Sequence, residues 1–442
     1  MTTVAEEKDA YRQRFERFVG TAGVEPDWQR GRRATAFARF VEKGLPGPRD
    51  EAWRQTPITP ITRTRWEPVE PTGGVPDDVA PPLSGSGQVV LVDGRYSPEL
   101  SNLDPDDPAL EVHSLHELLG SRPERLEPLL GEIQGAHATA FADLNAAFAA
   151  DGVVVFLAPG AILEEPLHLA HVATGTGSAP VSYSRVLVVA GKGSEGRILE
   201  TYAGPEGPAY LVNAVTEVVV EDNAFVDHYK LQMEGGQGFH VATLTARLGR
   251  DARFADHSFS FGAAISRNDI DVRFAAEGGE CVLDGLFLVD GTRLSDTHSR
   301  VDHARPHCSS RELYKGVLSE RARGVFNGLV LVRPGAQRTD AEQMNRNLLL
   351  SPEALVHSVP QLEILADDVK CRHGSTTGQL DPAALFYLRS RGIGEDEARG
   401  LLTWAFASDL VHDLPVPSLR QAVRRHLQAR LKGAALVDEA IA

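Results

Sequence analysis

A short pattern that recurs along the middle of the chain limits the folds open to it. An apolar residue or alanine, then Asp or Asn, then His or Gly, occurs at Val226-Asp227-His228, Ala255-Asp256-His257, Leu283-Asp284-Gly285, Val301-Asp302-His303 and Phe326-Asn327-Gly328. The Asp and Asn positions are 29, 28, 18 and 25 residues apart. Because a stacked coil of short strands repeats at roughly this interval, the pattern favours a β-solenoid with one polar corner residue per coil.

The surrounding composition agrees with a mainly β core. From about residue 152 to 370, short runs of Val, Ile, Leu and Phe alternate with Gly, Asp, Asn and Arg, without a helical period. Such runs are typical of a sandwich, a barrel or a solenoid, and the recurring pattern favours the solenoid. We therefore expect an N-terminal helical region with a linker over residues 1–150, a β-helix core over 151–375 and a C-terminal helical region over 376–442.

The two terminal regions carry helix signals. Apolar residues recur at helical spacing before residue 44, and the Pro- and Gly-rich stretch Pro68–Gly87 is predicted to be a linker. Near the C-terminus, Asp381 is a predicted N-cap, Pro382 occupies the first helical position, and Gly392 ends that helix.

Charge and cysteine content exclude several function classes. The 61 acidic residues outnumber the 45 basic ones, and the net charge of −16 disfavours nucleic acid and anionic membranes as partners. The three cysteines, Cys281, Cys308 and Cys371, form no CxxC motif, so neither a disulfide framework nor a self-contained metal site is expected. The charged N-terminus lacks an apolar signal region, and the longest apolar run is Val153–Ala158, so we predict a cytoplasmic protein.

A glycine motif and two cysteines suggest other chemistry, and most of them have a structural explanation. Gly191, Gly193 and Gly196 match GxGxxG, but the sequence that follows indicates a strand and not the helix that a dinucleotide site needs, so we expect a turn. No GxxxxGK[ST] motif occurs, so no P-loop for ATP is expected. Cys281 lies among apolar residues and is interpreted as a buried side chain. Cys308, beside His307, is a weaker functional candidate.

Three histidines of the recurring pattern, His228, His257 and His303, allow two interpretations. They could form a column of metal ligands, or they could be structural residues that stack and hydrogen-bond between coils. The structural interpretation is favoured, because a residue repeated at a corner position usually serves the stack.

The predicted last helix is basic in an otherwise acidic chain. It carries Arg420, Arg424, Arg425, Arg430 and Lys432 and no acidic residue, with Leu419, Val423, Leu427 and Leu431 at helical spacing. This helix is either a solvated face or a surface that docks on an acidic partner. We assign Arg420, Arg424, Arg425, Leu427 and Leu431 as candidate partner-binding residues.

The strongest candidate ligand site is the segment around Cys371 and His373. In an extended segment these two side chains point to the same face, and thiolate and imidazole are both iron ligands. The neighbouring Lys370 and Arg372 are expected to favour the thiolate. Since two ligands cannot hold a cluster, another chain must complete any such site. A structural cysteine beside an incidental histidine is the alternative.

At this segment the sequence resembles the SufB/SufD family. The similarity runs through QLEILADDVKCRHGSTTGQLDPAALFYLRSRGI (Gln361–Ile393) and, upstream, through the segment His307–Leu350. Shorter similar blocks are GLPGPRDEAWRQT, VDGRYSPELS and LNAAFAADG. The N-terminal block, the VFNG segment at Val325–Gly328, the chain length and the few cysteines resemble the SufD branch more than the SufB branch. Where the family commonly has CSHGAT, this chain has CRHGST.

The resemblance implies a right-handed parallel β-helix with helical termini, in a non-enzymatic scaffold subunit of iron–sulfur cluster assembly. It implies pairing with SufB, docking of the ATPase SufC on the C-terminal helices, and a nascent, transient Fe–S cluster at the SufB interface. His373, and with less support Cys371, correspond to the family's interface ligands. No cofactor is expected to be bound stably by the isolated chain, which could also homodimerise; binding of a reduced flavin to the complex stays open.

Three other functions compete with this interpretation. A SufB-like main scaffold and a purely structural β-helix partner would share the fold. A carbohydrate-active β-helix enzyme would need clustered carboxylates in a groove, and such enzymes are usually secreted. Substitution of His373 discriminates between the cluster scaffold and the structural partner.

Overall fold

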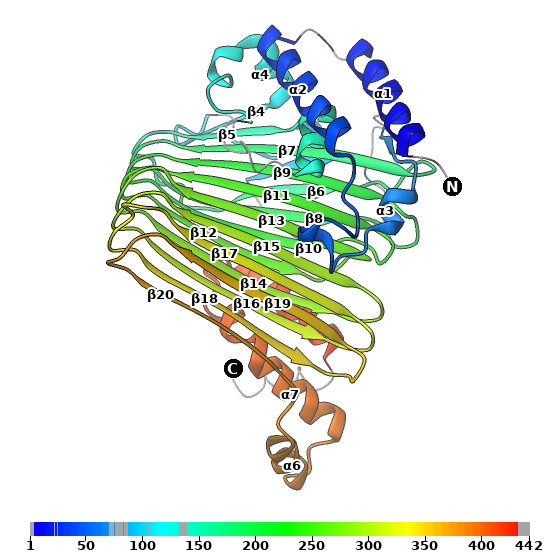
Figure 1. Cartoon of the computed structure of the whole chain (residues 1–442), viewed down its shortest axis with the longest axis vertical. Coiled ribbons are helices and arrows are strands. Elements are labelled where there is room, and N and C mark those ends of the chain that lie inside the picture. Colours follow the sequence, from blue (N-terminus) through cyan, green and yellow to red (C-terminus); the bar gives the residue numbers. More distant parts are fainter. Residues whose placement is uncertain are drawn as a thin grey trace.

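The middle of the chain winds into a parallel β-solenoid, as the sequence predicts (Figure 1). The computed structural model describes residues 4–21, 23, 25–69, 75, 83, 87–104, 106–131 and 139–431. Successive strands alternate between two sheets, and each pairs in parallel with the strand two places further along the chain. The handedness of the winding stays a prediction. Most of the linker expected at Pro68–Gly87 lies outside the described residues.

The odd-numbered solenoid strands form one sheet, called sheet A, and the even-numbered strands form sheet B. Sheet A contains β5 (Val153–Leu157), β7 (Pro180–Ala190), β9 (Leu211–Val220), β11 (Phe239–Leu248), β13 (Ile265–Phe274), β15 (Leu294–His303), β17 (Arg323–Val332) and β19 (Leu355–Ile364). Sheet B contains β6 (Leu167–Val172), β8 (Glu195–Ala203), β10 (Phe225–Met233), β12 (Arg253–Ser260), β14 (Glu280–Val289), β16 (Ser309–Leu318), β18 (Asp340–Leu349) and β20 (Lys370–Gly378).

The corner residue that repeats in each coil differs from the one predicted. The predicted Asp and Asn residues lie inside strands and not at corners; Asp302 and Asn327 lie in sheet A, whereas Asp227 lies in sheet B. The true corner repeat is a residue with positive φ between a sheet A strand and the next sheet B strand. These residues are Gly193, Asn223, Asp251, Gly278, His307 and Arg338.

These corner residues are 30, 28, 27, 29 and 31 residues apart. Each donates its backbone N–H to a carbonyl in the corner of the next coil, from Gly193 to Asp222 at 3.0 Å through to Arg338 and Asp368 at 2.6 Å. Gly, Asn and Asp accept positive φ at the lowest cost, which explains four of the six residues. The Gly191–Gly196 segment is accordingly a turn between β7 and β8, as predicted.

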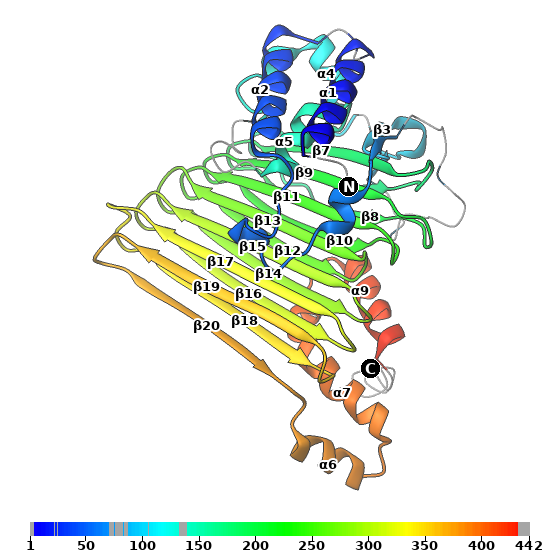
Figure 2. The same cartoon turned by 45° about the vertical axis from the view of Figure 1, so that its right-hand side comes forward.

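The N-terminal end of the solenoid is covered. Figures 1 and 2 show α1, α2 and α4 at that end, with α5 against the first strands of sheet A. Asn145 of α5 donates to the backbone oxygens of Ser184 and Asn213, at 2.8 and 2.9 Å, and so joins the helix to two coils. Antiparallel pairing of β4 with β5 and of β2 with β3 extends the two sheets at this end. The elements of this region are α1 (Val4–Thr21), α2 (Asp27–Lys43), η1 (Glu51–Trp53), α3 (Thr59–Arg63), β1 (Glu67–Pro68), β2 (Gln88–Val92), β3 (Arg95–Ser97), η2 (Pro98–Leu100), β4 (Leu110–Ser114), α4 (Leu115–Ser121), η3 (Pro123–Arg125) and α5 (Ala140–Phe148).

Of the four C-terminal helices that the structure describes, α7, α8 and α9 pack on the outer face of sheet B, whereas α6 projects beyond it (Figure 2). The four helices are α6 (Pro382–Ser390), α7 (Glu395–Ala407), α8 (Asp409–His412) and α9 (Pro417–Arg430). Trp404 and Leu419 pack with Phe259, Phe261 and Leu286 of the sheet. The predicted start of α6 is confirmed, since an Asp381 carboxylate oxygen accepts the Ala383 N–H at 2.9 Å. None of the described helices combines the length and hydrophobicity that crossing a membrane requires.

The interior of the solenoid has an apolar side and a polar side. Aliphatic and aromatic side chains such as Phe254 and Phe274 fill one side. On the other side, Glu200 accepts hydrogen bonds from Nε2 of His171 at 3.0 Å and of His228 at 2.8 Å. Burial alone lowers the pKa of His228, but hydrogen bonds to Asp256 and Glu200 outweigh it and raise the pKa to about 9. A buried, paired charge network therefore runs through the middle coils.

Candidate metal-ligand site

The last coil of the solenoid carries the predicted ligands. Strands β19 and β20 end sheets A and B, and among the described residues each pairs with a strand on one side only. Figure 2 shows these two strands at the end of the solenoid opposite the N-terminal helices. In β20, Cys371 lies in register with Ala341, and His373 with Gln343, both buried inside the solenoid. Cys371 and His373 therefore share one face, as predicted, and this face points inward at the open end of the solenoid.

This open end of the solenoid, called the mouth, is bordered by both terminal strands, β19 and β20. The Ser375 hydroxyl donates to the Ser358 hydroxyl at 2.8 Å and so links β20 to β19 across the opening. His373 is exposed, whereas Cys371 is half-buried beside Leu362 and Val369. No group of three or more His, Cys, Asp or Glu residues in the described part of the chain could hold a metal ion. Among the described residues, the two side chains therefore have no third ligand beside them.

The expectation that Lys370 and Arg372 favour the Cys371 thiolate is wrong. Burial raises the pKa of the Cys371 thiol. The Arg372 guanidinium lies on the opposite face of β20 and donates to the Glu342 carboxylate at 2.5 Å. The Arg372 guanidinium is therefore paired on the face away from Cys371. Of the two candidate ligands, His373 is the more exposed.

The other cysteines and histidines that the structure describes do not assemble a second site. Cys281 and Cys308 are both buried, and burial raises the pKa of each thiol. His228 points into the solenoid from sheet B, with Nδ1 2.6 Å from Asp256, whereas His257 is partly exposed beside Asp284 at 3.3 Å. His303 is buried in sheet A. The three histidines form no column: His228 hydrogen-bonds to Glu200 and Asp256 of the two neighbouring coils, whereas His257 only approaches Asp284 as an ion pair.

The predicted partner-binding helix, α9, is only partly available. Leu427 and Leu431 are buried in the cluster beneath the C-terminal helices and attach α9 to sheet B. Arg420 donates to the His412 backbone oxygen at 3.4 Å, and the Arg424 guanidinium lies 5.8 Å from the Trp404 ring centroid. Arg425 is exposed. Lys432 lies outside the described residues.

Helix α6 is an exposed apolar feature that the sequence reasoning missed. None of its residues is buried, and Phe386 and Tyr387 are 74% and 56% exposed. Figure 1 shows α6 projecting beyond the last coil. The sequence did offer a signal for this exposure. Two adjacent aromatic residues stand in a helix that has no apolar face of its own to bury.

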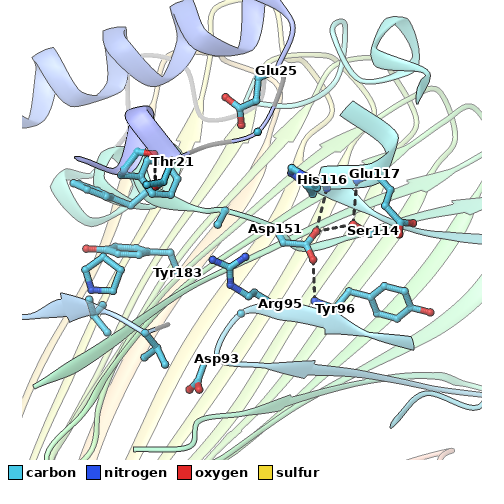
Figure 3. Close-up of a pocket in the computed structure, with 18 of the residues that line it drawn as sticks. Thr21, Glu25, Asp93, Arg95, Tyr96, Ser114, His116, Glu117, Asp151 and Tyr183 are labelled. Atoms are coloured by element: carbon cyan, nitrogen blue, oxygen red, sulfur yellow. Dashed lines mark hydrogen bonds between the residues drawn. The ribbon is translucent and has the colours of Figure 1, made fainter. Parts of the chain in front are cut away.

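A pocket of about 550 Å³ lies at the opposite, N-terminal end (Figure 3). Its central carboxylate, Asp151, accepts from the Ser114 hydroxyl at 2.8 Å and from the backbone N–H groups of His116 and Tyr96 at 3.0 and 3.1 Å. Asp151 therefore joins the segments that close the first coil, and its carboxylate oxygens are used as hydrogen-bond acceptors within the fold.

Comparisons with known proteins agree with the resemblance seen in the sequence. A family model described as SUF system FeS cluster assembly, SufBD core domain, matches residues 171–406, and one described as SufBD protein N-terminal region matches residues 77–169. A SufBD-family iron–sulfur cluster assembly protein of Synechocystis is 32% identical over 400 residues, 87% of each chain. The Escherichia coli iron–sulfur cluster assembly protein SufD is 31% identical over 402 residues, 90% of this chain and 92% of that one. The Bacillus subtilis SufD protein is 27% identical over 293 residues, 65% of this chain and 66% of that one.

Proposed function

This chain belongs to the SufBD family of the SUF iron–sulfur cluster assembly system, and we propose that it is the SufD-type scaffold subunit that pairs with SufB. In this proposal the open ends of sheets A and B meet the partner, and a nascent Fe–S cluster is built between the two subunits. The chain itself acts without catalysing a reaction, and ATP hydrolysis belongs to SufC.

The observation that carries the proposal is the position of His373 and Cys371 on β20, an edge strand that pairs on one side only among the described residues. Unpaired N–H and C=O groups on an edge strand favour pairing with another chain. Exposed apolar residues on β19, Leu355, Val359 and Ile364, add surface that a partner could bury. Because the described residues offer two candidate ligands at this end, the partner would supply the remaining ligands to the iron of the cluster.

We propose that the C-terminal helices dock SufC. The projecting α6 presents Phe386 and Tyr387, and Arg420 and Arg425 of α9 add positive charge. Aromatic residues and arginine are both enriched among the residues that contribute most to docking surfaces. Phe386→Ser should therefore reduce SufC recovery in a co-purification, whereas it should leave the solenoid folded, because Phe386 packs against none of the core clusters among the described residues.

The test of cluster assembly compares two exposed histidines of the last coil. The chain is co-expressed with its SufB and SufC partners as wild type, His373→Ala or His357→Ala, and reconstituted anaerobically with iron and sulfide. His357 is exposed on β19 but faces outward, opposite to the neighbouring Ser358. We expect His373→Ala to keep the complex and lose most of the bound iron and Fe–S absorbance, and His357→Ala to resemble wild type. Unchanged complex and cluster yields in His373→Ala would make this chain a passive structural partner.

A further inference from the structure

Three inward-facing side chains of sheet B lead from the solenoid interior to the mouth. Glu312 of β16 lies in register with Gln343 of β18, and Gln343 lies in register with His373 of β20. Neighbouring strands in a sheet are about 4.8 Å apart, so side chains in register on one face are direct neighbours. Glu312 and Gln343 are buried, whereas His373 is exposed at the end of the column.

The carboxamide of Gln343 is held in one place. Its nitrogen donates to the Glu312 carboxylate, which also accepts from the Ser299 hydroxyl at 3.4 Å. On the sheet A side, Gly328 leaves the space that the carboxamide occupies, because a Cβ at this position would lie 2.3 Å from Gln343 Nε2. The missing side chain of Gly328 and the acceptor on Glu312 together fix the amide.

The carbonyl oxygen of the same amide is unused. Gln343 Oε1 is buried and has no hydrogen-bond partner among the described residues. A buried acceptor without a partner costs about 1–3 kcal/mol, so such a group usually serves a further purpose. Because the amide nitrogen is committed to Glu312, the oxygen remains for the next side chain of the column, His373.

We propose that Gln343 is a positioning residue for His373: its unused carbonyl oxygen accepts an imidazole N–H when the exposed ring of His373 turns toward it. This hydrogen bond fixes the tautomer of His373 and leaves the lone pair of the other ring nitrogen for iron of the nascent cluster. Metal-binding histidines commonly donate their second N–H to a carbonyl or a carboxylate, which orients the ring. Glu312 acts one step further back by orienting the Gln343 amide. The inference rests on the proposed function, in which His373 is an iron ligand.

The test uses Gln343→Leu, which keeps the volume and removes the amide, in the complex with the SufB and SufC partners. The matched control is Asn347→Leu, which removes another buried inward amide from β18, in register with Thr377 and away from His373. Two properties are measured: the affinity for ferrous iron, and the tautomer of His373 from ¹⁵N chemical shifts in the full-length chain, with the His373 signal identified by its loss in His373→Ala.

We expect Gln343→Leu to change His373 from one tautomer to a mixture and to weaken iron binding by about 10-fold to 100-fold, as loss of an orienting partner does. Asn347→Leu should change neither property. In the His373→Ala background, Gln343→Leu should have no further effect on iron. Should Gln343→Leu fail to fold, Gly328→Ala displaces the amide without removing it, and the same losses are expected.

The outcomes separate this inference from the proposed function. If His373→Ala loses iron whereas Gln343→Leu and Gly328→Ala keep both the affinity and the single tautomer, the role of Gln343 is overturned and the proposed function stands. An equal loss in Asn347→Leu, or a further loss in the His373→Ala background, would also overturn it. If His373→Ala itself loses no iron, the proposed function fails and the inference falls with it.

Discussion

The two ends of the solenoid differ in how they treat the unpaired backbone groups of their edge strands. At the N-terminal end, short antiparallel strands and helices extend and cover the sheets, and Asn145 and Asp151 join the covering segments to the first coils. At the other end, β19 and β20 are exposed over most of their length. Long exposed edges invite pairing with other chains, so most proteins protect them. The open end among the described residues therefore supports the proposal that a partner binds there.

The interior shows the same difference. The middle coils contain charges with several partners each, centred on Glu200, whereas the last coils contain Glu312, which meets only Gln343 and Ser299 among the described residues. Stability should therefore depend strongly on the middle coils, and assembly on the last one. Four substitutions test this contrast.

The largest loss of stability is expected for Glu200→Leu. The change leaves the buried His171 and His228 without their shared acceptor, and breaking a buried charge pair costs about 3–5 kcal/mol. Urea unfolding of the isolated chain measures the loss. Glu363→Leu, on the exposed face of β19, is the control and should change little. Comparable midpoints for the two variants would remove the contrast between the middle coils and the last coil.

A smaller loss is expected for Lys315→Met, which releases the C-terminal helices. The buried ammonium of Lys315 donates to the Asp409 carboxylate at 2.5 Å and to the Phe406 backbone oxygen at 2.8 Å. Loss of these bonds should cost about 1–3 kcal/mol, and hydrogen exchange should quicken in α7 and α8 and not in β10. The control Arg389→Met removes an exposed ion pair with Glu395 and should cost at most about 1 kcal/mol. Uniform quickening across the solenoid would contradict a local attachment.

The third substitution, Glu312→Gln, should stabilise the chain at alkaline pH. Burial raises the pKa of Glu312 to about 7 from an ordinary value of 4.5, although hydrogen bonds from Gln343 and Ser299 oppose the rise. Because the folded carboxyl holds its proton more tightly, its contribution to stability is present below pH 4.5 and is lost as pH rises through about 7. Glu312→Gln avoids this loss.

The stability difference between Glu312→Gln and wild type should therefore be small near pH 4.5 and reach its full size above pH 7. Denaturant unfolding across this range measures it. A difference that stays constant with pH would mean that Glu312 does not titrate between these values in the folded chain.

The smallest effect on folding is expected for Val359→Asp, on the open end. Val359 is 46% exposed, so the folding free energy should change by about 0.5 kcal/mol or less. Pairing with SufB should weaken at least about tenfold, because a buried interface charge without a partner is costly. Val19→Asp, on a valine that is 42% exposed in α1 at the covered end, is the control and should leave pairing unchanged. Equal pairing by both variants would exclude β19 from the interface.

Much of the fold and part of the site could be predicted from the sequence because the signals are local. Asp381 and Pro382 mark the start of α6 through backbone capping, and the spacing of Cys371 and His373 in an extended segment places them on one face. The alternation of short apolar runs with turn residues indicated the solenoid. Each of these inferences depends on residues close together in the chain.

The corner repeat shows where such reasoning failed. Gly193, Asn223, Asp251, Gly278, His307 and Arg338 share a backbone conformation and not a residue type, so no letter pattern marks them. The recurring Asp and Asn residues that seemed to mark corners lie within strands of both sheets. Register between strands about 30 residues apart follows from the coil geometry, which a sequence motif does not reveal.

The sequence by itself determined the family, the β-solenoid and the shared face of Cys371 and His373, because these follow from local pattern and resemblance. Only the tertiary structure decided that Leu427 and Leu431 are buried, that the Cys371 thiol is disfavoured as a thiolate, and that Glu312, Gln343 and His373 form one column. Burial and side-chain neighbours across strands depend on how distant segments stack, and stacking is a property of the folded chain.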